Sequence, residues 1–176
     1  MKTNKFALPV LLILLIVCAS YGQTNQTRIR KAVAHLSPAM GYKVSGIVTF
    51  TRILNGVHIN ADIKGLPAGK HGFHVNQNSD CGSPDKSAAG TIFNPDNVKQ
   101  GWPNDTVRCV GDMGNLIANK KGIAHYEWTD TLMTFSGRHN IIGKSVTVDE
   151  WPDNYASQHS KKSKPHIACG IIKKVK

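Results

Sequence analysis

The chain has 176 residues, with 22 lysines and arginines against 11 aspartates and glutamates, which gives a net charge of +11 at pH 7. This length accommodates one domain with a short extension and excludes a multidomain enzyme. With 40% hydrophobic and 19% charged residues, the chain can bury a core and is not a disordered polyelectrolyte. The excess of positive charge predicts attraction to polyanions, whatever the fold.

The first 22 residues have the pattern of a secretory signal peptide. Lys2 and Lys5 precede an apolar run over 6–19, and small residues follow that run. The run is shorter than the roughly 20 apolar residues of a membrane-spanning helix, so we predict a cleaved signal over 1–22 and no membrane span. Cleavage before Gln23 leaves 20 basic and 11 acidic residues, a net charge of +9. For a secreted, extracellular protein we expect sulfated glycans or acidic matrix as partners, and no nucleic acid.

Cysteines and glycosylation motifs fit an oxidising compartment. Three cysteines remain after the signal, Cys81, Cys109 and Cys169, and an odd number predicts one disulfide and one spare thiol. Two sequons begin at Asn25 and Asn104 and predict N-glycosylation at both asparagines.

The mature chain alternates between short strands and turns. The clearest strand is 56–63, where Val57, Ile59, Ala61 and Ile63 alternate with polar residues, a period of two that is typical of a half-buried strand. Further strands are predicted at 31–36, 44–51, 115–118, 123–129, 132–134, 141–148 and 167–172.

Two long irregular stretches interrupt this pattern, at 76–112 and 150–165. Loops of that length in a compact domain are usually functional or held by a cross-link. We therefore expect an all-β domain over 31–172, an eight-stranded Greek-key sandwich or barrel with two long loops, after a flexible arm at 23–30 and before a basic tail at 173–176.

Several segments resemble those of copper/zinc superoxide dismutases, in the same order and at compatible spacing. They are GLPAGKHGFHV (65–75), SAAGTIFNP (87–95), VGDMGN (110–115), FSGRHNIIGKSVTVDE (135–150) and HIACGII (166–172). The resemblance covers roughly 31–172 and implies an eight-stranded Greek-key barrel. It also implies a disulfide between Cys81 and Cys169, which would close a loop of nearly ninety residues.

The resemblance also implies a copper and a zinc, but most of their ligand positions have changed. In the family, four histidines hold copper, and one of them bridges to a zinc that two further histidines and an aspartate hold. The corresponding positions here are His74, Asn76, Ile92 and Asp149 for copper, and Ile92, Gln100, Cys109 and Asp112 for zinc. Only one histidine of six remains, and His166 stands where the family has its superoxide-guiding arginine. We therefore expect no bound cofactor and no dismutase activity, because one imidazole cannot hold a redox copper tightly.

Two features of the vacated region leave alternatives open. His74, Asp149 and His166, with Asp112, are candidates for a weak copper or zinc site, against the simpler interpretation of leftover polar groups joined by hydrogen bonds. Cys109 is expected near the surface, as an unpaired thiol that could form an intermolecular disulfide in a covalent homodimer or a cross-linked matrix. The alternatives are an inert buried thiol or shuffled pairing with Cys81. His71 and His139 match non-ligand positions and are expected to be structural. His35, His58, His125 and His159 are expected at the surface.

Three clusters of basic residues lie on or next to the arm, in the second loop and at the C-terminus. A basic patch for acidic matrix or sulfated glycans is predicted at Lys161, Lys162, Lys164, Lys173, Lys174 and Lys176, extended on the arm by Arg28, Arg30 and Lys31. The function that we expect is that of a secreted pseudoenzyme acting as an extracellular binding, scaffold or matrix protein. The alternatives are a weak metal carrier and a residual superoxide-detoxifying enzyme.

Overall fold

A computed structural model describes residues 29–155 and 165–175 of the chain. The nine strands of these ranges are β1 (Lys31–Pro38), β2 (Ser45–Ile53), β3 (Gly56–Lys64), β4 (Gly69–Asn76), β5 (Asp112–Ala118), β6 (Ile123–Asp130), β7 (Ser145–Asp149), β8 (His166–Ile171) and β9 (Lys173–Lys174). One short 3-10 turn, η2 (Ser87–Ala89), lies in the long loop between β4 and β5.

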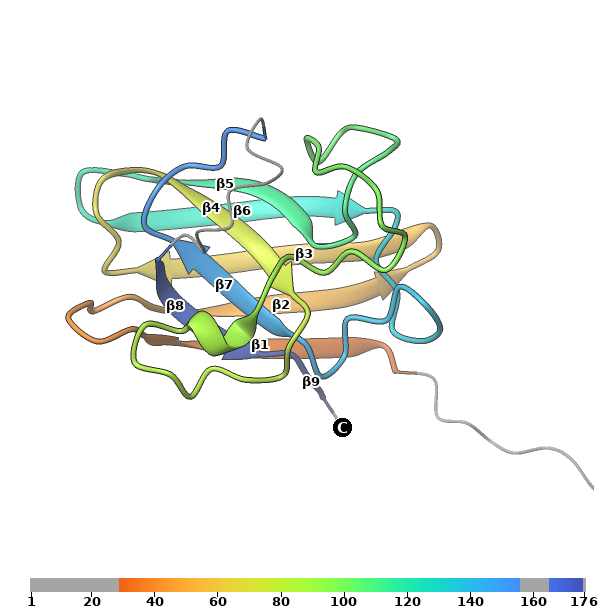
Figure 1. Cartoon of the computed structure of the whole chain (residues 1–176), viewed down its shortest axis with the longest axis horizontal. Helices are drawn as coiled ribbons and strands as arrows, with labels where there is room; N and C mark the ends of the chain where they lie inside the picture. The colour runs from red at the N-terminus through yellow and green to blue at the C-terminus, as the bar shows by residue number, and fades with distance from the viewer. Residues whose placement is uncertain (1–28, 156–164, 176) are drawn as a thin grey trace, which may run out of the picture.

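The strands form a nearly closed antiparallel barrel (Figure 1). Their order is β5-β4-β7-β8-β1-β2-β3-β6, and β1 joins the two halves by pairing with β2 and, at Ser37 and Pro38, with β8. The last strands in this order, β5 and β6, lie side by side, where the Tyr126 hydroxyl donates a hydrogen bond of 2.8 Å to the Met113 carbonyl oxygen. The β3–β4 and β6–β7 connections cross between the two halves, so the predicted Greek-key barrel is confirmed.

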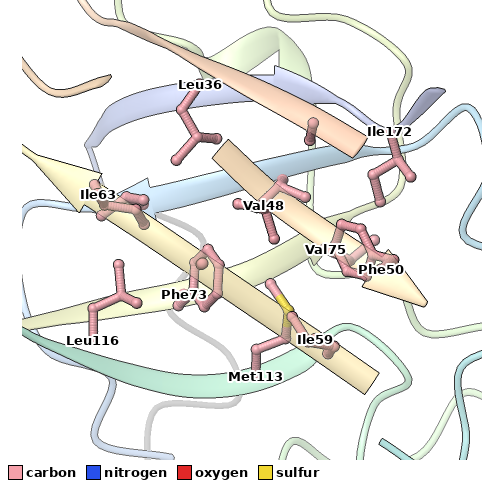
Figure 2. Packing of buried hydrophobic residues seen from close by; sticks show 14 of the residues in the cluster. Leu36, Val48, Phe50, Ile59, Ile63, Phe73, Val75, Met113, Leu116 and Ile172 are labelled. Carbon is pink, nitrogen blue, oxygen red and sulfur yellow. The ribbon is translucent and has the colours of Figure 1, made fainter. Parts of the chain in front are cut away.

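Alternation places the apolar side chains inside. On β3, Val57, Ile59, Ala61 and Ile63 are all buried, while the residues between them lie at or near the surface. The core continues across the facing strands through Phe50, Phe73 and other large apolar side chains (Figure 2). Burial of each such side chain contributes about 1.5–3 kcal/mol. Strands β4 and β7 lie in the middle of one half of the barrel.

The alternation of apolar and polar residues does not predict β4, because six consecutive residues of this strand, 71–76, are buried. A strand covered on both faces shows no period of two. Only the resemblance placed His74 and Asn76 on a common strand.

The strand predicted at 132–134 is wrong. The Asp130 carboxylate accepts hydrogen bonds from the backbone N–H groups of both Leu132 and Met133, each 2.8 Å long. These donors are therefore used in a side-chain-stabilised turn instead of a sheet ladder.

At the C-terminus, Lys173 and Lys174 form β9 and pair with Val33 and Ala32 of β1, so these two residues of the predicted tail belong to the sheet. Cys81 and Cys169 form a disulfide, as the resemblance implied, with their Cα atoms 5.7 Å apart. This bond links the long loop after β4 to the buried strand β8.

Candidate functional site

Three candidate residues meet on the adjacent strands β4, β7 and β8. In the antiparallel register His74 faces Thr147, and Asp149 pairs with His166 across a register shift at the end of β7. All three candidate side chains are buried. Sequence comparison correctly brings His74, Asp149 and His166 together.

The Asp149 carboxylate connects the two histidines. His166 Nδ1 donates to Asp149 Oδ1 at 2.6 Å, and His74 Nδ1 lies 3.4 Å from Asp149 Oδ2. Burial by itself raises the pKa of Asp149, but the hydrogen bonds from His166 and His74 and the positive charge of His74 outweigh it and leave the pKa lowered. Asp149 is therefore ionised at neutral pH.

A fourth residue, Asp153, extends this network and was not predicted. His74 Nε2 donates to Asp153 Oδ2 at 2.8 Å, and the Gln100 amide donates to the same oxygen. Burial lowers the pKa of His74, but the hydrogen bonds and negative charges of Asp149 and Asp153 raise it to about 9. His74 is thus an imidazolium held between two carboxylates at neutral pH.

Backbone contacts fix Asp153 in this position. Its N–H donates to the Asn115 side-chain oxygen at 2.7 Å, and the Asn115 amide donates to the Asp153 carbonyl oxygen at 3.0 Å. Asp153 lies in an irregular segment after β7, where no periodicity marks a buried residue. No local sequence pattern therefore predicts its burial.

Neutral groups occupy the two other positions that the resemblance assigns to copper. The Asn76 amide donates to the Gly90 carbonyl oxygen at 2.8 Å and lies 3.4 Å from His166 Nε2, while its oxygen accepts from Thr147 at 3.2 Å. Ile92 forms an isolated bridge with Asn76 and offers only hydrocarbon. A network of hydrogen bonds thus surrounds His74 where the family has three further imidazoles.

Asp112 begins β5 and has one satisfied and one unsatisfied oxygen. Its Oδ2 accepts hydrogen bonds from the N–H groups of Gly101 at 3.0 Å and Cys109 at 3.1 Å, whereas Oδ1 is buried without a hydrogen-bond partner among the described residues. Burial raises the pKa of Asp112 to about 6, against the hydrogen bond from Gly101 and the positive charge of His74.

The expectation that Cys109 lies near the surface is wrong. Its side chain is buried, with Sγ 3.8 Å from the Val98 carbonyl oxygen, because its neighbours Arg108 and Asp112 are themselves held by buried hydrogen bonds. Burial and the negative charge of Asp112 raise the pKa of Cys109 to about 12. The thiol is free of disulfides but is protonated and enclosed, an arrangement that favours the inert interpretation over a covalent dimer.

A metal-binding group forms from a different set than the predicted candidates. One ligand atom from each of His74, Asp112 and Asp153 lies within 4.8 Å of the other two, and all three residues are buried. This group includes Asp153 but neither Asp149 nor His166. It does not fit the copper/zinc pair, since one imidazole cannot replace the four histidines of the copper site and Ile92 cannot bridge two metals.

The other histidines have structural or surface positions. The ring of His71 is buried, with Nδ1 3.0 Å from the Asp149 carbonyl oxygen and Nε2 2.8 Å from that of Pro67. In His139, Nδ1 lies 3.0 Å from the Leu132 carbonyl oxygen and Nε2 lies 2.7 Å from Asp96 Oδ2. Both match the structural roles predicted for them. His35 and His125 are exposed and His58 is half-buried, while His159 lies outside the described residues.

The predicted glycosylation and basic positions are only partly described. Asn104, Lys173 and Lys174 are exposed, as is Arg30. The signal peptide and several predicted positions lie outside the described residues: Asn25, Arg28, Lys161, Lys162, Lys164 and Lys176. Within 29–155 and 165–175, no helix has the length and apolar character needed to cross a membrane.

The barrel, its disulfide and the motif positions define a protein of the superoxide dismutase class. The family model of copper/zinc superoxide dismutase (SODC) matches residues 44–172. The chain belongs to the copper/zinc superoxide dismutase family.

Its relatives include extracellular members of this family. An extracellular Cu-Zn superoxide dismutase of Drosophila melanogaster is 38% identical over 175 residues, covering 92% of this chain and 96% of the relative. An extracellular Cu-Zn superoxide dismutase of Caenorhabditis elegans is 32% identical over 173 residues, covering 93% of this chain and 76% of the relative. Among solved structures, the clock protein EA4 superposes with a TM-score of 0.74 at 33% identity, covering 84% of this chain and 96% of that one.

Proposed function

We propose that this chain is a secreted, non-catalytic member of its family, a pseudoenzyme whose barrel serves as an extracellular binding or scaffold protein. The observation that carries the proposal is Ile92, a hydrocarbon side chain at the position of the bridging ligand. Its neighbour Asn76 is a neutral amide engaged with Gly90 and Thr147, so it does not supply the missing bridging ligand.

The proposed loss of activity rests on the redox cycle of copper. A site that cycles between Cu(II) and Cu(I) needs several imidazoles in a fixed geometry. At this position His74 is the one imidazole retained from the set, and Asp149 and Asp153 engage both of its ring nitrogens. The signal-like segment at 1–22 and the extracellular forms among the relatives support the proposed secretion.

Copper-loaded protein is expected to show no superoxide dismutation above the background of free copper. The measurement is a superoxide assay after removal of unbound metal, with the Drosophila extracellular relative as positive control. A variant with His74→Ala serves as the matched background. A rate near that of the positive control, lost in this variant, would show that the chain is a residual enzyme.

Binding to polyanions is the proposed positive role. Lys173 and Lys174 are exposed on β9, and further lysines at 161, 162 and 164 precede β8 in the sequence. Such clusters attract sulfated chains over a Debye length of about 8 Å at physiological ionic strength.

The wild-type protein is expected to stay on a heparin column at physiological salt. Removing three positive charges with Lys161→Ser, Lys162→Ser and Lys164→Ser should cause elution at lower salt. The matched control removes the same charge from exposed positions elsewhere, with Lys64→Ser, Lys120→Ser and Lys121→Ser. Equal elution of both triple variants would mean that net charge acts alone and that no patch exists. Flow-through of the wild type would remove this partner class.

A further inference from the structure

We infer that His74, Asp112 and Asp153 form a buried site for one divalent cation of the Zn²⁺ class. This site combines residues in a way that neither half of the copper/zinc pair does. His74 belongs to the copper positions of the resemblance, Asp112 to the zinc positions, and Asp153 to neither set of ligands. The inference goes beyond the proposed function and does not depend on it.

The geometry supports a single ion. One ligand atom from each residue lies within 4.8 Å of the other two, so one ion can contact all three after small side-chain adjustments. The ligands come from three separate segments: β4, the start of β5 and the loop after β7. All three residues are almost fully buried, with exposures of 2% for His74, 0% for Asp112 and 4% for Asp153.

The second, independent observation is the unpaired oxygen of Asp112. Backbone N–H groups of Gly101 and Cys109 hold Oδ2, yet Oδ1 is buried without a hydrogen-bond partner among the described residues. An unsatisfied buried polar atom costs about 1–3 kcal/mol, and more when it is charged. A cation would satisfy this oxygen and offset the repulsion between the Asp112 and Asp153 carboxylates.

The surroundings of His74 suit a metal ligand. Its Nε2 donates to Asp153, so a bound ion takes the place of that proton while the carboxylate stays as a ligand. The other ring nitrogen, Nδ1, faces Asp149 at 3.4 Å, and His166 holds Asp149 in turn. A carboxylate behind a ligating histidine fixes the tautomer and orientation of the ring.

The donor set selects the class of ion. One imidazole nitrogen and two carboxylate oxygens suit Zn²⁺, which binds nitrogen at about 2.0–2.1 Å and carboxylate oxygen at about 2.0–2.2 Å. Three protein ligands leave room for a fourth donor, such as water. Because these ligands lie in different segments, a bound ion would fasten the segment around Asp153 to β4 and β5, and would therefore stabilise the fold.

The test is equilibrium dialysis of chelator-treated protein against micromolar Zn²⁺. We expect one ion per chain, and a loss of affinity of at least about 100-fold for both Asp112→Asn and His74→Gln, beyond the 10- to 100-fold typical of outer-shell changes. The matched control is Asp62→Asn. Asp62 also contacts a histidine, His125, at 2.8 Å, but lies exposed on β3, so binding should be unchanged.

Thermal melting and a Cys109→Ser variant separate the loss of the ion site from the loss of the fold. Zn²⁺ should raise the melting temperature of the wild-type protein but not of Asp112→Asn, a readout that detects variants that fail to fold. Cys109→Ser should bind normally, because the thiol is not in the group. No bound ion in the wild type, or binding lost only in Cys109→Ser, overturns the inference. The superoxide assay tests the proposed function separately, so either idea can fail alone.

Discussion

Replacing Arg108 by alanine is expected to lower the free energy of unfolding by about 3 to 5 kcal/mol. Arg108 and Asp130 form a buried ion pair, with Nη2 and Oδ2 2.6 Å apart. The guanidinium also donates to the Pro103 and Cys109 carbonyl oxygens, at 3.0 and 3.1 Å. Removing it leaves the Asp130 charge uncompensated inside the protein and deprives both carbonyl groups of a donor.

The effect should reach the candidate site, because Arg108 fastens the end of the long loop to β6. Cys109 is the next residue after Arg108, and Asp112, which carries the unpaired oxygen, comes three residues after Cys109. We therefore expect the buried thiol of Cys109 to become accessible to thiol reagents in Arg108→Ala while the wild-type thiol stays protected. Urea unfolding and thiol labelling measure these two effects separately.

A second arginine provides the matched control. Arg138 pairs with Asp96 at 2.9 Å, but its side chain is 69% exposed. Exposed pairs contribute about 0–1 kcal/mol, so Arg138→Ala should change the stability little. The double variant Arg108→Met with Asp130→Asn should be more stable than Arg108→Ala, because the second substitution removes the uncompensated charge. Equal losses for Arg108→Ala and Arg138→Ala would contradict this account of the buried pair.

The sequence predicted the barrel where local patterning and burial agree. On β3, alternating apolar residues face the core and the prediction was correct. On β4 the same logic failed, because burial on both faces removes the alternation. At 132–134 three apolar or β-prone residues suggested a strand, but Asp130 captures the backbone donors that a ladder requires.

The candidate site was predictable only where a motif fixed the register. His74, Asp149 and His166 came together because motifs anchor each of their strands. Asp153 was missed, since it lies in an irregular segment and depends on Asn115 from another strand for its position. Burial of Cys109 stood only as the alternative to a surface position, because no local pattern shows that its neighbour Arg108 pairs with the distant Asp130 inside the protein.

Breaking the disulfide between Cys81 and Cys169 is the second change with a large expected effect. The bond joins residues 88 positions apart, so chain-entropy reasoning gives a stabilisation of roughly 4 to 5 kcal/mol. It also attaches the loop after β4 to the barrel. The Pro84 carbonyl oxygen in that loop accepts from the Met40 N–H at 2.8 Å, a contact that should weaken with the bond.

We expect a reducing agent to lower the urea midpoint of the wild-type protein, and Cys81→Ala to reproduce that loss without reductant. In Cys81→Ala the reductant should then have no further effect, because the remaining cysteines are already thiols. The matched control is Cys109→Ala, which removes a buried cysteine outside the disulfide and should keep the full sensitivity to reductant. A wild-type midpoint that is unchanged by complete reduction, verified by thiol counting, would show that packing around β8 alone holds the loop.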